Sequence, residues 1–499
     1  MARARFRTAL GWAFVLNWGR QGGAALITFV LAAMLGPDAF GTVALAQVYL
    51  LFIEMFQEQG LSKALIQRGD LDDRHLDTVF WTNIGLSAFL WAGSLVGAPL
   101  YARLSGDDAS GLGGVIVALS LTVPINALTI VQQSVLQRDL DFRSLALRAN
   151  AALWIGGAVG IGTALAGFGV WALVAQTLTA SVASLALLWT LSRWRPRLRF
   201  DRAALRELME FSVGALLARL AQFANRRGDV LVVGYLVSPA AVGLYRLAQR
   251  LMELPLELST RSVQAVSFPA FARLHGEPAA LRNRLEQGIW VGATLATPGL
   301  FVLAVLAPEV LAVIGGEWVE AAATLQLLCL AGVGRAAIVQ TGPLLQAVGR
   351  PMLLAALVSV ITVVGVGIAV LAFRAVEGEP LSSQIAAIAA SRAGVVLLLQ
   401  GPLFLAIMAK LSGMRGATLL RTYLPTLATG AAAWVVAALL RAELPLAGAS
   451  AVARLLAYGA STGLCVAIAL WATDARFREL ARATHKRVLR RGPQPADES

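Results

Sequence analysis

Hydrophobic residues gather along this chain in long blocks that short polar segments separate. Blocks of about twenty apolar residues can cross the hydrocarbon core of a bilayer, which is roughly 30 Å thick. Lipid offers no partner to backbone groups, so such blocks must be helices or strands of a closed barrel. Their continuity favours helices over alternating strands. About fourteen spans are predicted, with approximate limits 10–35, 40–61, 80–102, 112–136, 146–166, 169–191, 209–236, 240–265, 286–307, 320–346, 352–373, 383–408, 418–440 and 450–473.

The composition agrees with this pattern. Hydrophobic residues make up 58% of the chain, charged residues 14%, and the mean hydropathy is +0.70. A soluble protein carries about 25% charged residues, so too little polar surface remains to cover a water-soluble globule. The chain is predicted to be an all-α, polytopic membrane protein.

The formal charge of +13 changes the picture through its distribution. If the N-terminus lies in the cytoplasm and the spans alternate, most loop Lys and Arg residues fall inside. The outside loops then hold only Arg103, Arg374 and Arg441. This bias predicts that both termini lie on the cytoplasmic side of the membrane. Since the basic residues sit in short loops between spans, no nucleic-acid partner is expected.

An internal repeat divides the chain. Residues 37–47 open the second predicted span and residues 239–249 open the eighth, and Pro, Ala, Gly, Leu, Ala and Gln coincide between them. An offset of six spans preserves orientation, which predicts two six-helix bundles related by a pseudo-two-fold axis along the membrane normal. Chance similarity between two helix starts is the alternative. The predicted parts are an N-terminal bundle (1–191), a basic cytoplasmic linker (192–208), a C-terminal bundle (209–408), helices 13 and 14 (409–473) and a basic cytoplasmic tail (474–499).

Ionisable residues within the spans follow single helix faces. They are expensive inside a membrane and usually face a bundle interior or an aqueous cavity. The eighth span has a stripe spaced at helical intervals, and shorter polar stripes mark the first, second and seventh spans. We therefore expect a central hydrophilic cavity lined by the cations Arg20, Arg219, Arg226, Arg246 and Arg250, with the acids Glu54, Glu58, Asp229, Glu253 and Glu257 as ion-coupling or ion-pairing groups.

Two interpretations of these stripes stay open. Buried ion pairs that fix helix packing would explain single pairs, such as Arg250 with Glu253 or Glu257. Eleven arginines fall within the predicted spans, however, against these five acids. Such a surplus of guanidinium groups suits an anionic passenger such as a phosphate or pyrophosphate.

Motifs of common enzymes are missing from the sequence. There is no phosphate-binding G-x-x-x-x-G-K-[ST] loop, no G-x-S-x-G elbow and no H-E-x-x-H. Asp70, Asp72 and Asp73 contain a D-x-D pattern, which holds a metal in some membrane glycosyltransferases, but a solvated turn is the more frequent origin of so short a motif. Cys329 and Cys465 indicate neither a disulfide framework nor a metal site. No enzyme activity, organic cofactor or metal is predicted.

A set of short segments is recognisable as a group: residues 36–41, 58–61, 64–68, 78–81, 137–143, 167–173, 225–255, 315–318 and 349–350. Together they resemble the polysaccharide transporter (Wzx-like oligosaccharide flippase) branch of the multidrug/oligosaccharidyl-lipid/polysaccharide exporter superfamily. The resemblance covers most of residues 1–415, and the last two spans match only in hydrophobicity.

The resemblance implies a two-lobed transporter that flips an undecaprenyl-pyrophosphate-linked oligosaccharide outward by alternating access, for a surface or secreted polysaccharide such as lipopolysaccharide or exopolysaccharide. It also implies coupling to a proton or sodium gradient. The expected partners are the lipid-linked glycan, membrane lipids, a polysaccharide polymerase and glycosyltransferases. The alternatives are a multidrug-type antiporter, a membrane-embedded glycan-processing enzyme and a scaffold for polysaccharide assembly.

Overall fold

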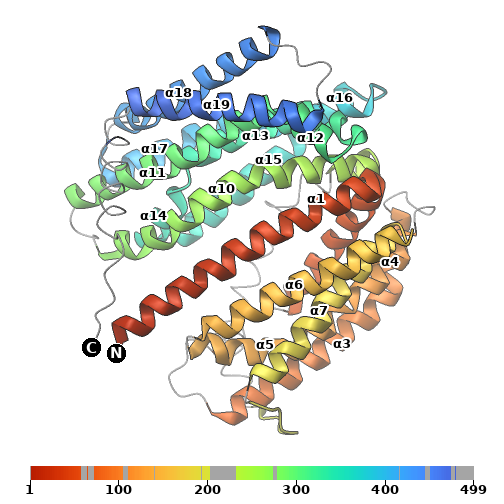
Figure 1. Ribbon diagram of the computed structural model, residues 1–499. Coiled ribbons are helices and arrows are strands. Elements are labelled where there is room, and N and C mark those ends of the chain that lie inside the picture. The colour runs from red at the N-terminus through yellow and green to blue at the C-terminus, as the bar shows by residue number, and fades with distance from the viewer. Residues whose placement is uncertain are drawn as a thin grey trace, which may run out of the picture. The chain divides into compact units, whose positions relative to one another are not determined.

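A computed structural model describes the structure of residues 2–57, 65, 72–104, 111–139, 141–192, 194–202, 232–273, 278–414, 416–443, 450–473 and 478. These residues form helices and short connections, without a strand among them. The prediction of an all-α membrane fold is confirmed. By contacts the chain divides into two compact units (Figure 1).

The first unit comprises Met1–Leu247, Ile314–Glu320 and Ala355–Ile388. It contains six long or medium helices from the N-terminal part of the chain, together with most of the short helix η1 (Gly316–Ala321) and of α15 (Pro351–Ala375). The six are α1 (Ala2–Gln57), α3 (Asp73–Leu104), α4 (Leu112–Ser120), α5 (Thr122–Arg138), α6 (Phe142–Leu165) and α7 (Val170–Leu191).

The first two predicted spans form one labelled helix, α1, which is broken at Gly36 (φ 73°, ψ 177°). Glycine adopts this left-handed backbone without a Cβ clash. Pro37 follows it, and proline lacks the N–H that a continuous helix would need. Trp318 of η1 packs at this break, where its Nε1 donates to the carbonyl oxygen of Ala32 at 3.0 Å. The Trp318 ring also meets Phe40 edge-on, with ring centroids 5.8 Å apart.

Helix α6 packs against α1 and α7, and α3 packs against α4 and α5. The core at one end of this unit contains Val79, Phe80 and Val131, with the rings of Trp189 and Trp194 against it. Phe80 lies 5.7 Å from the Trp194 ring, centroid to centroid. Large aromatic rings at this end fill the space between α3, α5 and the segment that follows α7.

The second unit comprises Ala248–Val313, Ala321–Leu354 and Ala389–Ser499. Most of helix α10 (Pro239–Arg273) lies in it. The π-helical stretch that ends at Gln400 runs directly into the next helix. The other elements are α11 (Pro278–Val305), α12 (Ala307–Ile314), α13 (Ala322–Ala337), α14 (Thr341–Ala347), the end of α16 (Leu381–Gly394), η2 (Val395–Gln400), α17 (Gly401–Ser412), α18 (Gly416–Glu443) and α19 (Ala451–Thr473).

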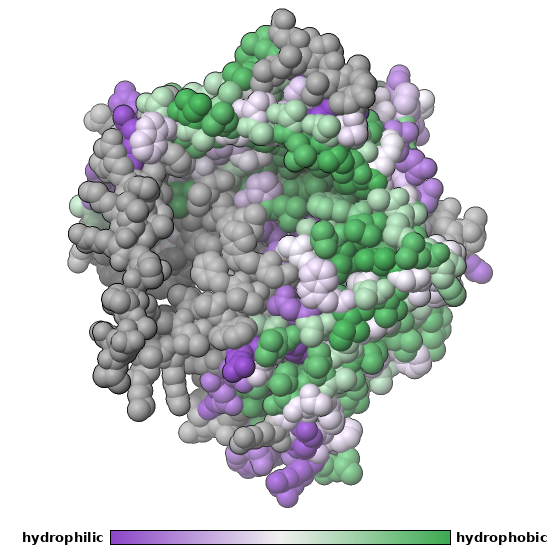
Figure 2. All heavy atoms as spheres, viewed as in Figure 1, coloured by the Kyte–Doolittle hydropathy of each residue, from purple (hydrophilic) through white to green (hydrophobic). Residues whose placement is uncertain are grey.

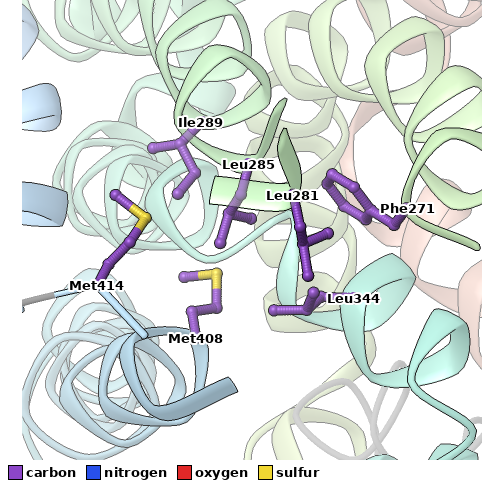
Figure 3. Packing of buried hydrophobic residues seen from close by; sticks show 7 residues of the cluster. All are labelled: Phe271, Leu281, Leu285, Ile289, Leu344, Met408 and Met414. Carbon is purple, nitrogen blue, oxygen red and sulfur yellow. The ribbon is translucent and has the colours of Figure 1, made fainter. Parts of the chain in front are cut away.

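A cluster of buried hydrophobic side chains packs α11, α14 and α17 of this unit together (Figure 3). Leu281, Leu285 and Ile289 follow one face of α11, at spacings of four residues, and Met408 of α17 lies against them. Leu344 of α14 completes the contact. Methionine adapts its unbranched side chain to gaps of this kind.

Helix α18 is tied to α11 and to α13 of the same unit. The hydroxyl of Tyr423 donates to the carbonyl oxygen of Val333 at 2.5 Å and lies 3.1 Å from the Thr297 hydroxyl. Near the other end, Arg441 pairs with Glu309 and donates to the carbonyl oxygen of Val305 at 2.9 Å. Helix α19 packs on α18, so helices 13 and 14 of the prediction belong to this compact unit.

Where they are described, the predicted spans are helical over most of their length. Span 40–61 is described only as far as residue 57, and span 209–236 only at residues 232–236, which are helical. Ten described helices are long and apolar enough to cross a membrane, and Tyr423–Leu439 is a shorter apolar helix. Hydrophobic residues cover much of the described surface in Figure 2, as expected of a protein solvated by lipid. The predicted boundaries of the bundles, linker and tail stay predictions.

The contact of Arg441 generates a test of stability. Replacing Arg441 with methionine leaves Glu309, which is 8% exposed, without its cation. We expect a loss of about 1–2 kcal/mol, below the usual cost of breaking a buried pair because the Arg441 side chain is 37% exposed. The measurement is the melting temperature of the purified protein.

The matched control is Arg374→Met. Arg374 also lies in the last turn of its helix and is exposed, and among the described residues it has no hydrogen bond or ion pair. Its replacement should leave the melting temperature unchanged. Equal effects of the two substitutions would show that the pair with Glu309 does not stabilise α18.

Candidate functional site

Helix α10 carries the charged stripe that the sequence predicts. Arg246, Arg250, Glu253 and Glu257 recur every three or four residues, so they share one helix face. All four are partly exposed. The Nη1 atom of Arg250 lies 3.5 Å from Oε2 of Glu257, and these side chains are 29% and 20% exposed.

The rest of α10 is packed. Leu244, Tyr245, Ala248, Leu251 and Met252 are buried, between 0% and 4% exposed. The helix is therefore held in place by its apolar side, while its charged side stays accessible. The ion pair of Arg250 with Glu257 is of the kind that the packing interpretation predicted. The paired atoms are 3.5 Å apart, and both side chains are partly exposed.

The other predicted site residues are described only in part. Glu54 lies in the second half of α1 and is partly exposed. Arg20 lies in α1, but its side chain is outside the described part. The following residues lie outside the described residues altogether: Glu58, Arg219, Arg226 and Asp229. The structure thus aligns four of the predicted residues on one helix face, and the convergence of all ten on one cavity stays a prediction.

The two copies of the internal repeat touch each other within the first unit, which is a contact that the sequence did not predict. A Cβ atom added to Gly41 would lie 1.7 Å from the carbonyl oxygen of Pro239. A Cβ atom added to Gly243 would lie 2.1 Å from the carbonyl oxygen of Pro37. Backbone thus meets backbone, an approach that only glycine allows. We call this contact, formed by Pro37, Gly41, Pro239 and Gly243, the glycine crossing.

The glycine crossing is reciprocal. Gly41 contacts Pro239 just as Gly243 contacts Pro37, and both pairs of equivalent positions are 202 residues apart in sequence (239 − 37 and 243 − 41). Reciprocal contact between equivalent residues is the mark of a two-fold relation. This geometry supports a true repeat over the chance similarity of two helix starts.

Glu317 lies beside the crossing on the same unit. Its Oε2 atom would be 3.0 Å from a Cβ atom on Gly36, directly before Pro37. Together with Trp318, which packs at the break in α1, it surrounds this turn with a carboxylate and an indole. The Gly-Gly-Glu-Trp segment was singled out by the family resemblance alone, and the structure gives it a position at the crossing.

The segment that follows α7 is hydrogen-bonded to the start of α3. The backbone N–H of Arg197 donates to Oδ1 of Asp77 at 2.9 Å, and that of Asp201 donates to Oγ1 of Thr78 at 3.0 Å. The indole of Trp81 donates to the carbonyl oxygen of Arg197 at 2.8 Å. The described part of the predicted basic linker, residues 194–202, is therefore docked on its own unit.

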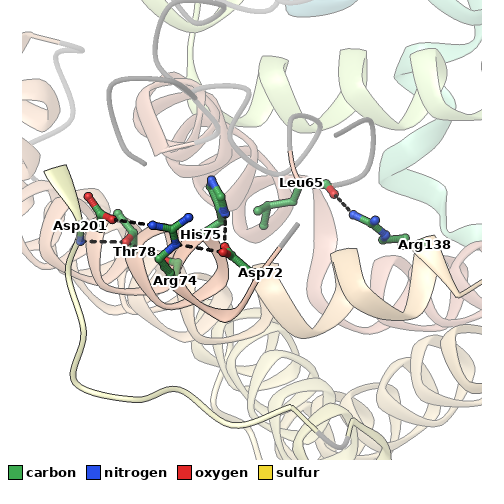
Figure 4. Close-up of polar contacts among 7 residues, drawn as sticks. All are labelled: Leu65, Asp72, Arg74, His75, Thr78, Arg138 and Asp201. Atoms are coloured by element: carbon green, nitrogen blue, oxygen red, sulfur yellow. Dashed lines mark hydrogen bonds and ion pairs between the residues drawn. The ribbon is translucent and has the colours of Figure 1, made fainter. Parts of the chain in front are cut away.

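The turn before α3 adds charged contacts to this docking site (Figure 4). Asp72 accepts from Nε of Arg74 at 2.9 Å and lies 2.5 Å from Nδ1 of His75. Desolvation acts to raise the pKa of Asp72, but the hydrogen bonds from His75 and Arg74 hold that pKa below its ordinary value. Nη1 of Arg74 also reaches Asp201 at 3.8 Å.

These contacts bear on the D-x-D pattern. Asp72 is engaged by His75 and Arg74, and Asp73 pairs with Arg197 at 3.5 Å. Asp70 lies outside the described residues. Within the described ranges no group of three or more His, Cys, Asp or Glu side chains is placed to hold a metal ion. The two aspartates here orient basic side chains at a helix start.

Comparisons with known proteins agree on one group. The family model described as "Polysaccharide biosynthesis protein" matches residues 30–323. The succinoglycan biosynthesis transport protein ExoT of Rhizobium meliloti is 28% identical over 323 residues, which are 64% of this chain and 65% of that protein. The lipopolysaccharide biosynthesis protein WzxC of Escherichia coli is 24% identical over 327 residues, with the same two shares. The matches thus span slightly less than two thirds of these relatives.

Solved structures give the fold. The lipid II flippase MurJ, in an inward closed conformation, superposes with a TM-score of 0.70 at 14% identity, over 93% of this chain and 99% of that one. An inward-facing multidrug resistance MATE family transporter superposes with a TM-score of 0.62 at 18% identity, over 78% and 96%. At these identities the likeness shows the fold alone.

The glycine crossing generates a second test. Replacing Gly41 or Gly243 with alanine places a methyl group inside the opposite backbone, so the two helix starts must separate. We expect each substitution to lower the stability of the purified protein by about 1–3 kcal/mol, as overpacking does. Thermal unfolding of the purified protein measures this loss.

Gly93→Ala is the matched control, since an added Cβ there meets nothing within 4 Å. It should be neutral or slightly stabilising in a helix interior. If Gly41→Ala and Gly243→Ala are as stable as Gly93→Ala, the crossing is not a close contact.

The docked linker generates a third test. Asp77→Ala removes the acceptor of the Arg197 backbone N–H, a hydrogen bond to a charged group. Such bonds contribute roughly 1.5–3 kcal/mol, so trypsin should cut after Arg197 or Arg199 about tenfold faster. Limited proteolysis of the purified protein measures the rate. Asp139→Ala, which changes an exposed aspartate, should leave cleavage at wild-type speed, and equal rates in both variants would refute the docking role.

Proposed function

Because this chain belongs to the polysaccharide biosynthesis protein family, we propose that it moves a lipid-linked oligosaccharide across the bacterial inner membrane. The family and the similarity to a succinoglycan transport protein support a transport protein rather than an enzyme. The proposal specifies the cargo as an undecaprenyl-pyrophosphate-linked repeat unit of a surface or secreted polysaccharide.

The charged stripe of α10 carries this proposal. It places two arginines on one face of a helix whose other face is buried, and leaves the Arg250 side chain 29% exposed. A cation in a membrane helix is retained where it meets water or an anion. A pyrophosphate is an anion that matches guanidinium geometry, because its oxygens accept two parallel N–H bonds.

The cargo has three chemical parts, and the chain would treat each differently. The pyrophosphate would bind the arginines of the stripe, together with Arg20, Arg219 and Arg226 if these face the same cavity. The sugars would occupy the aqueous space beside them. The polyprenyl tail is as apolar as the bilayer itself and would stay in lipid, since nothing is gained by removing it.

Alternating access would use the glycine crossing as its closed end. Positive charge places the N-terminus inside, which puts the start of the second span, and with it Gly41, toward the outside. Two helix starts in backbone contact leave no room for a sugar to pass. Release to the outer leaflet would therefore require Gly41 and Gly243 to separate. The helix ends on the predicted cytoplasmic side, near the docked linker, would then approach each other.

Acidic groups are the candidates for coupling to a proton or sodium gradient. Glu253 and Glu257 accompany the arginines on α10, and Glu54 lies in α1. The pair of Glu257 with Arg250 places one of these acids directly beside a proposed contact of the pyrophosphate. Glu58 and Asp229 are further candidates. A polymerase and glycosyltransferases would be the partners that consume and supply the cargo.

The rival function is that of a multidrug antiporter, because the fold is also that of a MATE transporter. Cationic drugs need acidic or aromatic contacts, whereas the stripe of α10 pairs its acids with arginines. Drug susceptibility of an efflux-deficient host that expresses this chain separates the two functions, since a flippase gives no protection.

The double substitution Arg246→Gln and Arg250→Gln tests the cationic site. Glutamine is shorter than arginine but stays polar and removes the charge, so pyrophosphate loses two charge-assisted partners, each worth about 1.5–3 kcal/mol. We expect outward transfer to fall about a hundredfold or more. The measurement is accumulation of the lipid-linked intermediate on the cytoplasmic face of cells that depend on this chain.

Arg374→Gln is the control, because it removes an exposed charge at a helix end. Membrane insertion of each variant is checked by its yield after detergent extraction. Normal export by the double variant, and by alanine variants of all five predicted cations, would contradict the cationic cavity.

A further inference from the structure

The docked linker, residues 194–202, lies where α7 ends and α3 begins. It follows α7 directly, and it is hydrogen-bonded to Asp77, Thr78 and Trp81 of α3. Both helices are long and apolar enough to cross a membrane. The candidate span of α3 has 31 residues and is therefore about 46 Å long, whereas the hydrocarbon core of a bilayer is roughly 30 Å thick. The first turns of α3, and the linker bound to them, thus lie among the lipid headgroups.

Three tryptophans mark the same level of the first unit. The rings of Trp81, Trp189 and Trp194 surround Phe80, with centroids 5.4, 6.4 and 5.7 Å from the Phe80 centroid. All three tryptophans are partly exposed. Tryptophan is enriched where a protein passes from lipid to water, because its ring is apolar and its N–H is polar. The docked linker therefore runs along an aromatic belt at the membrane surface.

Hydrogen bonds hold the docked linker at both ends. At its beginning, Nη2 of Arg195 donates to the carbonyl oxygen of Trp189 in the last turn of α7, at 2.6 Å. Further along, the backbone N–H groups of Arg197 and Asp201 donate to α3, and Figure 4 shows the second of these contacts, at Thr78. The residues between Arg197 and Asp201 are therefore fixed in position against the start of α3.

Two large apolar side chains project from this fixed segment. Leu198 is 88% exposed and Phe200 is 55% exposed. Each would be unremarkable alone on a protein surface, but here they stand two residues apart on a backbone that is bonded to the protein. Both lose contact with water if the boundary between headgroups and acyl chains covers them, which is favourable for apolar surface.

Arginines alternate with these apolar side chains. Arg197 pairs with Asp73 at 3.5 Å, yet its side chain stays 61% exposed. Arg199 and Arg202 are exposed, and their side chains make no hydrogen bond or ion pair with the part of the chain that the structure describes. Two guanidinium groups are thus available to an anion on the same segment as the two apolar side chains.

Two acidic side chains beside the linker are engaged by arginines. Asp73 pairs with Arg197, and Asp201 lies 3.8 Å from Nη1 of Arg74. Over residues 192–208 the sequence holds six arginines and two acidic residues, so the acids of the linker do not cancel its positive charge. A basic segment with apolar side chains, placed at headgroup level, is attracted to an anionic lipid surface.

We propose that the docked linker is an interfacial anchor that lies on the anionic lipid surface of one leaflet. Leu198 and Phe200 enter the boundary between headgroups and acyl chains, and Arg199 and Arg202 bind lipid phosphates beside them. By the predicted topology this leaflet is the cytoplasmic one. Because the linker is hydrogen-bonded to α3, the anchor fixes the depth of the first unit in the membrane.

Fluorescence quenching by brominated lipids tests the anchor in the full chain. A cysteine replaces Leu198 or Phe200 and carries a nitrobenzoxadiazole fluorophore, in a protein with Cys465→Ala; Cys329 is 1% exposed and stays unlabelled. The protein is held in nanodiscs of phosphatidylglycerol and phosphatidylcholine in equal amounts, one of which is brominated near the headgroup. We expect quenching of both fluorophores, and quenching by phosphatidylglycerol about fivefold more effective, as one arginine near an anionic lipid surface gives.

Two controls match these measurements. A fluorophore at Asp139, an exposed residue in the turn between α5 and α6, should be quenched several-fold less by either lipid. The double substitution Arg199→Gln and Arg202→Gln should bring the ratio of the two lipids to about one. Arg374→Gln, which removes an exposed arginine of another helix, should keep the ratio of the unsubstituted arginines.

Three results would overturn the anchor. If fluorophores at positions 198 and 200 are quenched no more than the one at position 139, the two apolar side chains do not meet lipid and are open to a cytoplasmic protein instead. Equal quenching by the two lipids before the arginines are replaced means that an anionic surface is not recognised. A preference for phosphatidylglycerol that survives the double substitution means that Arg199 and Arg202 do not provide it.

Discussion

Placing a guanidinium group between two hydrocarbon layers costs several kcal/mol unless water, an anion or a carboxylate meets it. Helix α10 bears two such groups in its middle and keeps a buried apolar face beside them. This cost dictates what the helix can be. It cannot turn its charged side to lipid, so that side must face protein or an aqueous space, and the packing of Tyr245, Leu251 and Met252 fixes the rotation of the helix accordingly.

A second constraint acts at the start of the same helix. The glycine crossing brings two backbones together without side chains between them, and this requires that both helix starts be rigid. Proline opens each of them, with its backbone torsion already set for a helix. Gly36 supplies the left-handed turn before Pro37, and Trp318 occupies the space that this turn leaves. A small set of residues thus forms a joint whose opening would be all-or-none, because packed surfaces have discrete arrangements.

Much of this fold followed from hydrophobicity alone, because the backbone in lipid has almost no choice but helix. The repeat at residues 37–47 and 239–249 could be recognised in the sequence because proline and glycine cannot be exchanged at a close crossing. The same prolines and glycines form the contact between the two helix starts. Contacts across the chain were not predictable. Nothing in the pattern showed that Asp77 receives a backbone N–H from Arg197, because the partner is 120 residues away. For the D-x-D pattern the sequence favoured a turn over a metal site, and in the structure Asp72 is engaged by the nearby Arg74 and His75.

The two copies of the repeat are not chemically equivalent. With the repeat offset of 202 residues, Ala44 is the equivalent of Arg246 and Val48 is the equivalent of Arg250. Likewise, Leu51 corresponds to Glu253 and Met55 to Glu257. Ala44 and Val48 are 7% and 3% exposed, whereas the Arg250 side chain is 29% exposed. The two copies therefore share the joint at their starts but not the charge along their lengths.

Such a division would suit the proposed cargo, a lipid-linked sugar. A molecule with a single anionic group gains little from two equal cationic surfaces, because the surface that it does not touch would hold unpaired charge in a low dielectric. The equivalent of Gln249 is Gln47, which keeps a polar side chain in both copies. Uncharged polarity is thus common to both copies at this position, whereas the arginines of the α10 stripe have uncharged equivalents in α1.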